Sequence, residues 1–180
     1  AASDVYKRQH VDCVTKAISN FGRRISGKRL LLAYSGGVDS HMLLHGMSRF
    51  AVSSQGEVIA FHFNHRASPK SDLWEQHCLE VCNSLNIELL RRSSFEFPGV
   101  SGGSENALRV ARYDWFRSIM SNGDILVTAH QMDDQIETIL FRLFRGGGVR
   151  GLTGIPDRRK FGPGELHRPL LGVTRPDILS

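Results

Sequence analysis

The chain has 180 residues, of which 41% are hydrophobic, so it holds enough apolar material for one domain with a buried core. No stretch approaches the roughly 18 consecutive apolar residues that a membrane span needs, so a membrane role is not expected. Lys and Arg number 23 against 18 Asp and Glu, and the net charge of +5 favours a polyanionic partner such as a nucleic acid or a nucleotide. No charged-then-apolar leader with a cleavage site is visible, which predicts a cytoplasmic location.

The two ends of the chain have weaker patterns than the middle. Residues 1–9 show no hydrophobic period and are expected to be a leader that is non-native or unstructured, followed by one domain over residues 10–173. Residues 174–180 have the composition of a capped helix start, with Pro176 in the first turn and apolar residues after it. They are expected to begin a helix that the chain truncates.

Hydrophobic periods divide the first 144 residues into alternating elements. Val11–Ile25 has a helical stripe with basic residues at its C-terminal end, where the helix dipole favours them. The apolar run Arg29–Tyr34 is typical of a strand buried on both faces, and Asp39–Phe50 resumes a helical period. The same patterns predict strands over Val58–Phe63, Ile87–Arg91 and Ile125–Thr128, and helices over Lys70–Leu85, Glu105–Met120 and Asp133–Phe144.

This order of elements predicts an α/β fold. Parallel strands need crossover connections, so the alternation indicates a doubly wound parallel sheet with helices on both faces. The remaining segment, Arg145–Pro176, is rich in glycine and proline. It is expected to be mostly loop, with one strand near Leu166–Leu171.

A glycine-rich loop, Ser35-Gly36-Gly37-Val38-Asp39-Ser40, follows the first predicted strand and opens a helix. Backbone N–H groups and the positive helix dipole at this edge favour an anion, and paired glycines let the backbone approach a pyrophosphate closely. The hydroxyls of Ser35 and Ser40 can add hydrogen bonds, and Asp39 can hold a divalent cation that bridges phosphates. The competing interpretation is an ordinary turn in which Asp39 or Ser40 caps the helix.

An acidic helix follows the fourth predicted strand and therefore begins at the same edge of the sheet. His130, Asp134 and Glu137 are spaced to share one helix face. Carboxylates so close repel each other and favour a cation, which can be Mg²⁺, an arginine or the ammonium of an amine substrate. The competing interpretation is a capped helix whose first-turn acids serve the dipole alone.

Two resemblances follow from these motifs. The glycine loop resembles that of the PP-loop, or N-type, ATP pyrophosphatases, adenine nucleotide alpha hydrolase-like enzymes that split ATP between its α and β phosphates to adenylate a substrate. A wider set of motifs resembles the bacterial tRNA(Ile)-lysidine synthetase family. It comprises His62-Phe-Asn-His65, Glu105-Asn-Ala-Leu-Arg-Val-Ala-Arg-Tyr113, Val127-Thr-Ala-His-Gln-Met-Asp-Asp-Gln-Ile-Glu-Thr138, Arg145-Gly-Gly-Gly-Val-Arg-Gly-Leu152 and Arg168-Pro-Leu-Leu171.

The second resemblance implies a ligase acting on the wobble cytidine, position 34, of tRNA(Ile) with a CAU anticodon. ATP would adenylate O2 of the cytidine with release of pyrophosphate, and the ε-amine of free lysine would then attack C2 and expel AMP. ATP and Mg²⁺ are the implied cofactors, L-lysine is the co-substrate, and the assembly can be a homodimer. The family also has C-terminal tRNA-binding domains, which are expected to be missing here.

The resemblance also implies roles for particular residues. ATP would be bound by Ser35, Gly36, Gly37, Val38, Asp39, Ser40 and His62, with Mg²⁺ on Asp39 and catalysis by Asp39, Asp134, Glu137 and Arg112. Asp134 and Glu137 would bind the ammonium of lysine or a metal. Arg109 or Arg112 would bind the carboxylate of lysine or a phosphate. The competing interpretation for these arginines is an ion pair between Glu105 and Arg109. Arg145 and Arg150 would contact the tRNA backbone, unless their segment is only a solvated basic loop.

Two other functions stay open from the sequence. A tRNA thiolase of the same family would need reactive cysteines, and Cys78 and Cys82 lie within a predicted helix, away from the carboxyl edge of the sheet. A non-catalytic module that binds ATP or RNA is also compatible with the fold, because a fold does not determine function. Such a module would leave the carboxylates of the acidic helix without a task.

Overall fold

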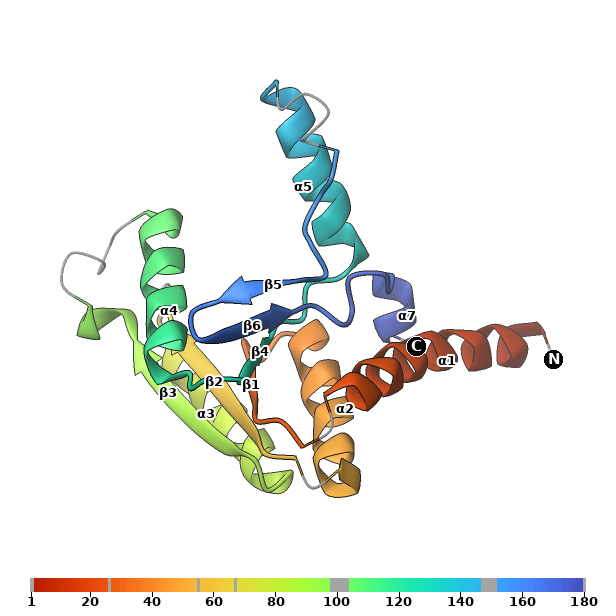
Figure 1. Ribbon diagram of the computed structural model, residues 1–180, viewed down its shortest axis with the longest axis horizontal. Coiled ribbons are helices and arrows are strands. Elements are labelled where there is room, and N and C mark those ends of the chain that lie inside the picture. Colours follow the sequence, from red (N-terminus) through yellow and green to blue (C-terminus); the bar gives the residue numbers. More distant parts are fainter. Residues whose placement is uncertain are drawn as a thin grey trace.

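The computed structural model describes residues 2–25, 27–54, 56–66, 68–97, 104–146 and 152–179, with the side chains of residues 2–12 and 50–54 outside this description. Strands and helices alternate along most of the chain (Figure 1). The elements are α1 (Ala2–Arg24), β1 (Leu30–Ala33), α2 (Val38–Ser54), β2 (Val58–Asn64), α3 (Ser71–Ser84), β3 (Glu88–Ser93), the 3-10 helix η1 (Ser94–Glu96), α4 (Glu105–Ile119), β4 (Ile125–Val127), α5 (Met132–Phe144), β5 (Arg158–Phe161), β6 (Gly164–His167) and α7 (Arg175–Leu179). Within the described residues, no helix is long and apolar enough to cross a membrane.

The strands form one six-stranded sheet in the order β3-β2-β1-β4-β6-β5. Every neighbouring pair is parallel except β5 and β6, which are antiparallel. The chain runs from β1 outward to β2 and β3, and then returns to β4 on the other side of β1. The carboxyl ends of β1 and β4 therefore meet at a topological switch point, where doubly wound folds bind their ligands.

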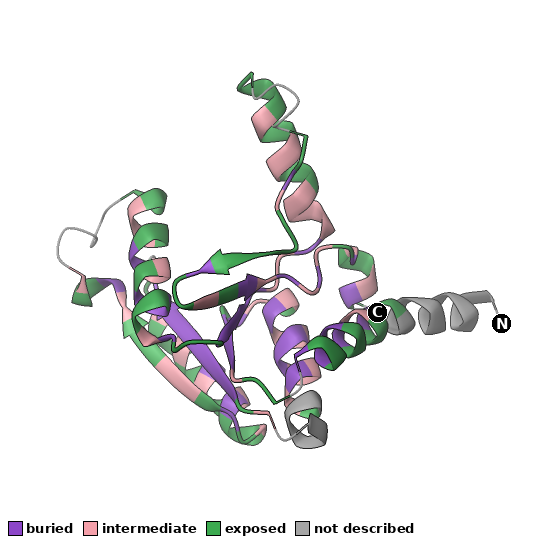
Figure 2. Ribbon diagram, viewed as in Figure 1, coloured by how far each residue is buried: buried purple, intermediate pink, exposed green. Residues whose placement is uncertain are grey.

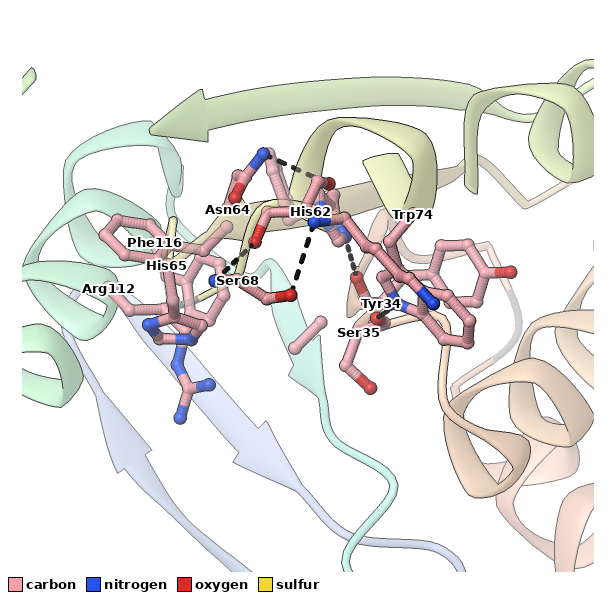
Figure 3. A pocket seen from close by; sticks show the side chains of 14 residues that line it. Tyr34, Ser35, His62, Asn64, His65, Ser68, Trp74, Arg112 and Phe116 are labelled. Atoms are coloured by element: carbon pink, nitrogen blue, oxygen red, sulfur yellow. Dashed lines mark hydrogen bonds between the residues drawn. The ribbon is translucent and has the colours of Figure 1, made fainter. Parts of the chain in front are cut away.

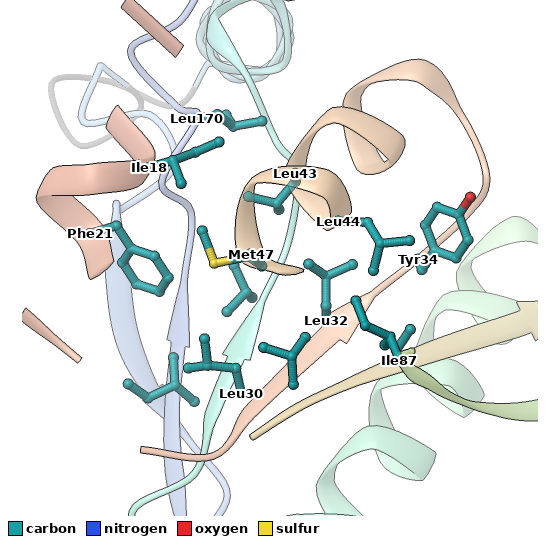
Figure 4. Close-up of a cluster of buried hydrophobic side chains, with 14 of the residues drawn as sticks. Ile18, Phe21, Leu30, Leu32, Tyr34, Leu43, Leu44, Met47, Ile87 and Leu170 are labelled. Carbon is teal, nitrogen blue, oxygen red and sulfur yellow. The ribbon is translucent and has the colours of Figure 1, made fainter. Parts of the chain in front are cut away.

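Alternate residues of the central strands supply two separate cores. Leu30 and Leu32 of β1 pack with residues of α1, α2, α3 and α7 on one face (Figure 4). Leu31 packs on the other face with Trp115 and Phe116 of α4. All three leucines are buried, because both faces of β1 are covered by helices. The predicted doubly wound sheet with helices on both faces is confirmed.

The structure differs from the predicted elements at both ends of the chain. The first helix begins at Ala2 rather than Val11, while the origin of residues 1–9 stays a prediction. The segment expected to hold one strand forms the antiparallel pair β5 and β6, and the second strand ends at His167 rather than Leu171. Leu166 and Phe161 of this pair are buried against the α4 core, so the pair extends the central sheet.

Helix α5 leaves the body of the domain. None of its residues is buried, and Figure 2 shows only intermediate and exposed residues along it. Its base is held by Gln135, whose side-chain amide donates to the carbonyl of Ile155 at 3.1 Å and accepts from the Ile155 N–H. Farther along, Arg142 donates to the carbonyl of Gly154 at 2.7 Å. The segment before β5 is therefore fixed against one side of α5.

Candidate active site

The glycine loop lies at the carboxyl end of β1 and is organised by its own hydroxyl groups. Ser40 donates to the carbonyl of Gly37 at 2.9 Å, and the Ser35 and Ser40 hydroxyl oxygens are 3.0 Å apart. The N–H of Gly37 donates to the Ser35 hydroxyl at 3.3 Å. The loop is thus shaped by local hydrogen bonds at the start of α2, where the helix dipole favours an anion.

Helix α3 supports the loop from outside. The indole of Trp74 donates to the carbonyl of Ser35 at 2.8 Å. Gly36 has a φ of +82°, and a Cβ at this position would lie 2.6 Å from the Cys78 sulfur and 2.7 Å from the Trp74 indole nitrogen. Glycine is required here because the backbone is left-handed and the side chains of α3 fill the space.

Asp39, at the start of α2, has a carboxylate with an unused buried oxygen. Its Oδ1 is buried without a hydrogen-bond partner among the described residues, and its Oδ2 lies 3.6 Å from the Arg175 guanidinium. Burial raises the pKa of Asp39, Arg175 opposes that shift, and the nearby Asp134 and Asp133 raise the pKa further. A buried oxygen without a partner is costly, so a bound cation would stabilise this arrangement.

The same carboxylate lines a small cavity above the loop, which we call the loop cavity. Its volume is about 210 Å³, and it brings Ser35, Gly37, Asp39 and Ser40 together with His130 and Asp134. The sequence prediction that the glycine loop and the acidic helix lie side by side is therefore correct. No group of three or more His, Cys, Asp or Glu suited to a metal occurs among the described residues. A magnesium ion here would need phosphate oxygens or water as additional ligands, as is usual for this ion.

A second, mostly apolar cavity of about 410 Å³ lies beside the loop, at the ends of β1 and β2 (Figure 3). We call it the strand-end cavity. Its walls include Phe116, Trp74 and the buried His62, whose Nδ1 lies 3.0 Å from the carbonyl of Tyr34. Burial lowers the pKa of His62. A neutral imidazole next to an apolar cavity is suited to an uncharged ring.

The N-terminus of α5 uses its acids partly for capping. Asp134 Oδ2 accepts from the N–H of Gln131 at 2.8 Å, and the Gln131 side chain accepts from the N–H of Asp133 at 2.8 Å. The capping interpretation is therefore correct for one oxygen of Asp134. A carboxylate has two oxygens, however, and Asp134 also lines the loop cavity. Glu137 is exposed one turn farther along α5.

A third cavity of about 860 Å³ lies between α4, α5 and the segment around β5 and β6, and we call it the arginine cavity. Asp134 and Glu137 line one side, and Arg109, Arg112 and Arg168 also line it. His130 lines it too, and the pKa of His130 is lowered by burial and by the nearby guanidinium groups.

The predicted arginines of α4 are arranged around one aromatic ring. Arg109 and Arg112 lie 5.7 and 5.6 Å from the centre of the Tyr113 ring. The ion pair between Glu105 and Arg109 is not among those of the described residues. Arg112 lines all three cavities, and burial lowers its pKa.

Some site residues follow from the sequence motifs and others do not. Trp74 stands in no recognised motif, and Tyr113 ends a recognised motif but was given no role, because an aromatic residue on a helix is more often part of a core. Arg168 stands in a recognised motif, but nothing in its spacing shows that it reaches the arginine cavity. Arg145, at the C-terminal cap of α5, lies 5.0 Å from the centre of the Phe141 ring, whereas Arg150 lies outside the described residues.

Comparison with known proteins identifies the class of domain that this fold and site define. A family model described as a PP-loop domain matches residues 9–180. The chain therefore belongs to the PP-loop domain family. The glycine loop at the end of β1 is the feature from which the sequence predicted this membership.

Among curated proteins, the chain is similar to several called tRNA(Ile)-lysidine synthase. The protein from Coxiella burnetii is 44% identical over 155 residues, which are 85% of this chain and 34% of the relative. That from Pseudomonas aeruginosa is 44% identical over 148 residues, covering 82% of this chain and 33% of the relative. The chain thus spans about a third of the length of these relatives.

Solved structures with the same fold have other functions. The U34-tRNA thiolase NcsA from Methanococcus maripaludis, solved with its 4Fe-4S cluster, has a TM-score of 0.75 and 14% sequence identity, covering 96% of this chain and 62% of that chain. NMN synthetase from Francisella tularensis has a TM-score of 0.53 and 15% identity, covering 97% of this chain and 67% of that chain. At these identities the likeness extends to the fold alone.

Proposed function

We propose that this chain is the nucleotide-binding catalytic domain of a ligase that joins lysine to C2 of cytidine 34 in tRNA(Ile) with a CAU anticodon. The observation that carries the proposal is the shared wall of two cavities. Arg112, His130 and Asp134 line both the loop cavity and the arginine cavity. A nucleotide activated at the glycine loop would therefore adjoin a space for a second substrate, as a two-step transfer requires.

ATP would occupy the loop cavity and the strand-end cavity together. The N–H groups of the glycine loop would hold the departing pyrophosphate, and the adenine would lie in the apolar space beside His62. Mg²⁺ would bind the buried oxygen of Asp39, and phosphate oxygens and water would complete its coordination. When bound, the ion would neutralise negative charge that develops on the phosphates.

Lysine would enter through the arginine cavity. The carboxylates of Asp134 and Glu137 would attract its ε-ammonium, and one must accept a proton before the amine can attack C2. Arg112 would stabilise charge on the adenylate, because it lines all three cavities. AMP would then leave with its bonding electrons, and lysidine would remain in the RNA.

The tRNA would approach along α5. Phe141 and Arg142 line the arginine cavity, and Arg145 continues the same side of the helix outward. Exposed aromatic rings next to arginines suit single-stranded RNA, since bases stack on the rings and phosphates pair with the guanidinium groups. Phe144 is 87% exposed near the end of this path. A cytoplasmic location and a homodimer remain part of the proposal.

The thiolase alternative is less well supported. Cys78 and Cys82 are fully buried, and burial raises their pKa values to about 11 and about 12. Thiols with such pKa values hold little thiolate at neutral pH, and the thiolate is the reactive form. Cys13 is exposed on α1. A binding module without catalysis would leave the carboxylates of Asp134 and Glu137, which line the arginine cavity, without a function.

One assay separates these functions. The complete protein is incubated with ATP and unmodified tRNA(Ile), and release of pyrophosphate is followed with lysine, with a sulfur donor or with neither. The proposal expects pyrophosphate release in the presence of the tRNA and AMP release that depends on lysine. Dependence on the sulfur donor would indicate a thiolase, and the absence of ATP cleavage would indicate a binding module.

A further inference from the structure

Arg168 is a buried arginine without a carboxylate partner. It follows β6 and is 7% exposed, and its Nη1 donates to the carbonyl of Pro156 at 2.7 Å. The Tyr113 side chain also forms a hydrogen bond with Arg168. Among the described residues, however, the Nε of Arg168 has no hydrogen-bond partner and Arg168 forms no ion pair with a carboxylate. A guanidinium group has five N–H donors and stays charged, so this arrangement leaves a buried positive charge without a counter-ion.

The position of Arg168 restricts which anion can act as its counter-ion. Arg168 lines the arginine cavity but not the loop cavity, so it does not reach the space assigned to the phosphates of ATP. Asp134 and Glu137 line the arginine cavity as well. A cavity with both a carboxylate pair and an unpaired guanidinium suits a ligand that carries both charges. A free amino acid with a basic side chain is such a ligand.

The surroundings fix Arg168 before any ligand binds. Pro156, whose carbonyl accepts from Arg168, follows the segment that Gln135 and Arg142 attach to α5. The Arg168 backbone N–H also donates to the carbonyl of Asp157 at 2.8 Å. Tyr113, which lies against Arg109 and Arg112, also lines this cavity. The guanidinium is thus held in place by the Pro156 carbonyl and the Tyr113 side chain rather than by an acidic residue, and ordering it at the time of binding costs little.

We propose that Arg168 binds the α-carboxylate of the amino acid substrate while Asp134 and Glu137 bind its side-chain ammonium. The proposal rests on the proposed function and adds to it the residue that selects an amino acid over a simple amine. Arg168 acts by binding the end of the substrate opposite to the reacting amine. It determines specificity and takes no part in proton transfer.

The test compares lysine with cadaverine, which has the same amine chain without the carboxylate. In the complete protein, Arg168→Gln is expected to lower kcat/KM for lysine by about 10- to 100-fold, the range for losing a charge-assisted hydrogen bond. With cadaverine the variant is expected to match the unmodified protein within about twofold, because no carboxylate is present to lose. The matched control is Arg158→Gln, which replaces an exposed arginine of β5. In this variant kcat/KM should stay unchanged both for lysine and for cadaverine.

Each other outcome overturns the assignment in a recognisable way. Equal losses with lysine and cadaverine would make Arg168 a structural residue, and a raised KM for tRNA with normal lysine use would make its anion an RNA phosphate. Adenylation of the tRNA, measured without lysine, shows whether Arg168→Gln is folded. If that variant does not fold, the comparison is made with Arg168→Lys, which keeps the charge. If the unmodified protein adenylates tRNA but uses no lysine, the proposed function itself is wrong, and the assignment of Arg168 falls with it.

Discussion

Replacing Gly36 with alanine tests how the glycine loop is held. The φ of +82° alone should cost about 1–2 kcal/mol for a residue with a Cβ. That Cβ would also lie 2.6 Å from the Cys78 sulfur, and overpacking of this kind adds about 1–3 kcal/mol. Alanine has fewer conformations than glycine in the unfolded chain, which stabilises the folded state by roughly 0.4–1 kcal/mol. We therefore expect Gly36→Ala to lose about 1–5 kcal/mol of unfolding free energy.

Gly123→Ala is the matched control. Gly123 has a φ of +86°, but a Cβ there would meet nothing within 4 Å, so only the backbone cost applies. We expect it to lose about 0–1.6 kcal/mol in urea unfolding, which is less than Gly36→Ala by the overpacking cost of about 1–3 kcal/mol. Pyrophosphate release should fall in Gly36→Ala and stay normal in Gly123→Ala. Equal stability and equal activity of the two variants would refute the account of α3 supporting the loop.

Three further predictions concern charge. Asp39→Asn should reduce pyrophosphate release about 100-fold or more, the usual scale for removing one electrostatic contact to a transition state, without lowering the urea midpoint. Full activity in a folded variant would show that Asp39 has no role in the site. Glu137→Gln should raise KM for lysine more than KM for ATP, and an equal rise in both would contradict its assignment. Burial lowers the pKa of His62, so the unfolded chain binds more protons than the folded chain as the pH falls below about 6.5. The unfolding free energy should therefore decrease from pH 7 to pH 5, and it should decrease less steeply in His62→Gln. Parallel pH profiles of the two proteins would show that His62 contributes nothing to this dependence.

Patterns that repeat along the sequence were enough to predict most of the fold. A continuous apolar run next to a glycine loop identifies β1 because a strand covered on both faces needs apolar residues at every position. The β5–β6 pair was not predicted. Its strands have four residues each, and only Phe161 and Leu166 among them are buried, so little in the sequence shows that they pack against α4.

The residues of the candidate site also fall into those that the sequence predicted and those that it did not. The loop residues and the acids of α5 were found because their chemistry is local in the sequence. Trp74 was not found, and Arg168 was recognised in a motif without a role, because their roles arise from contacts across the fold, with Ser35 and with Pro156. A helix face or a loop motif does not indicate which distant backbone carbonyl a side chain will meet.

The most direct test of the proposed function is transfer of labelled lysine. The complete protein is incubated with labelled L-lysine and unmodified tRNA(Ile) carrying a CAU anticodon, with and without ATP, and the label is followed into the RNA. We predict label in the RNA only when ATP is present, and none when Asp39→Asn replaces the unmodified protein. Cleavage of ATP to AMP and pyrophosphate with no label in this RNA would contradict the account and assign the site to another substrate.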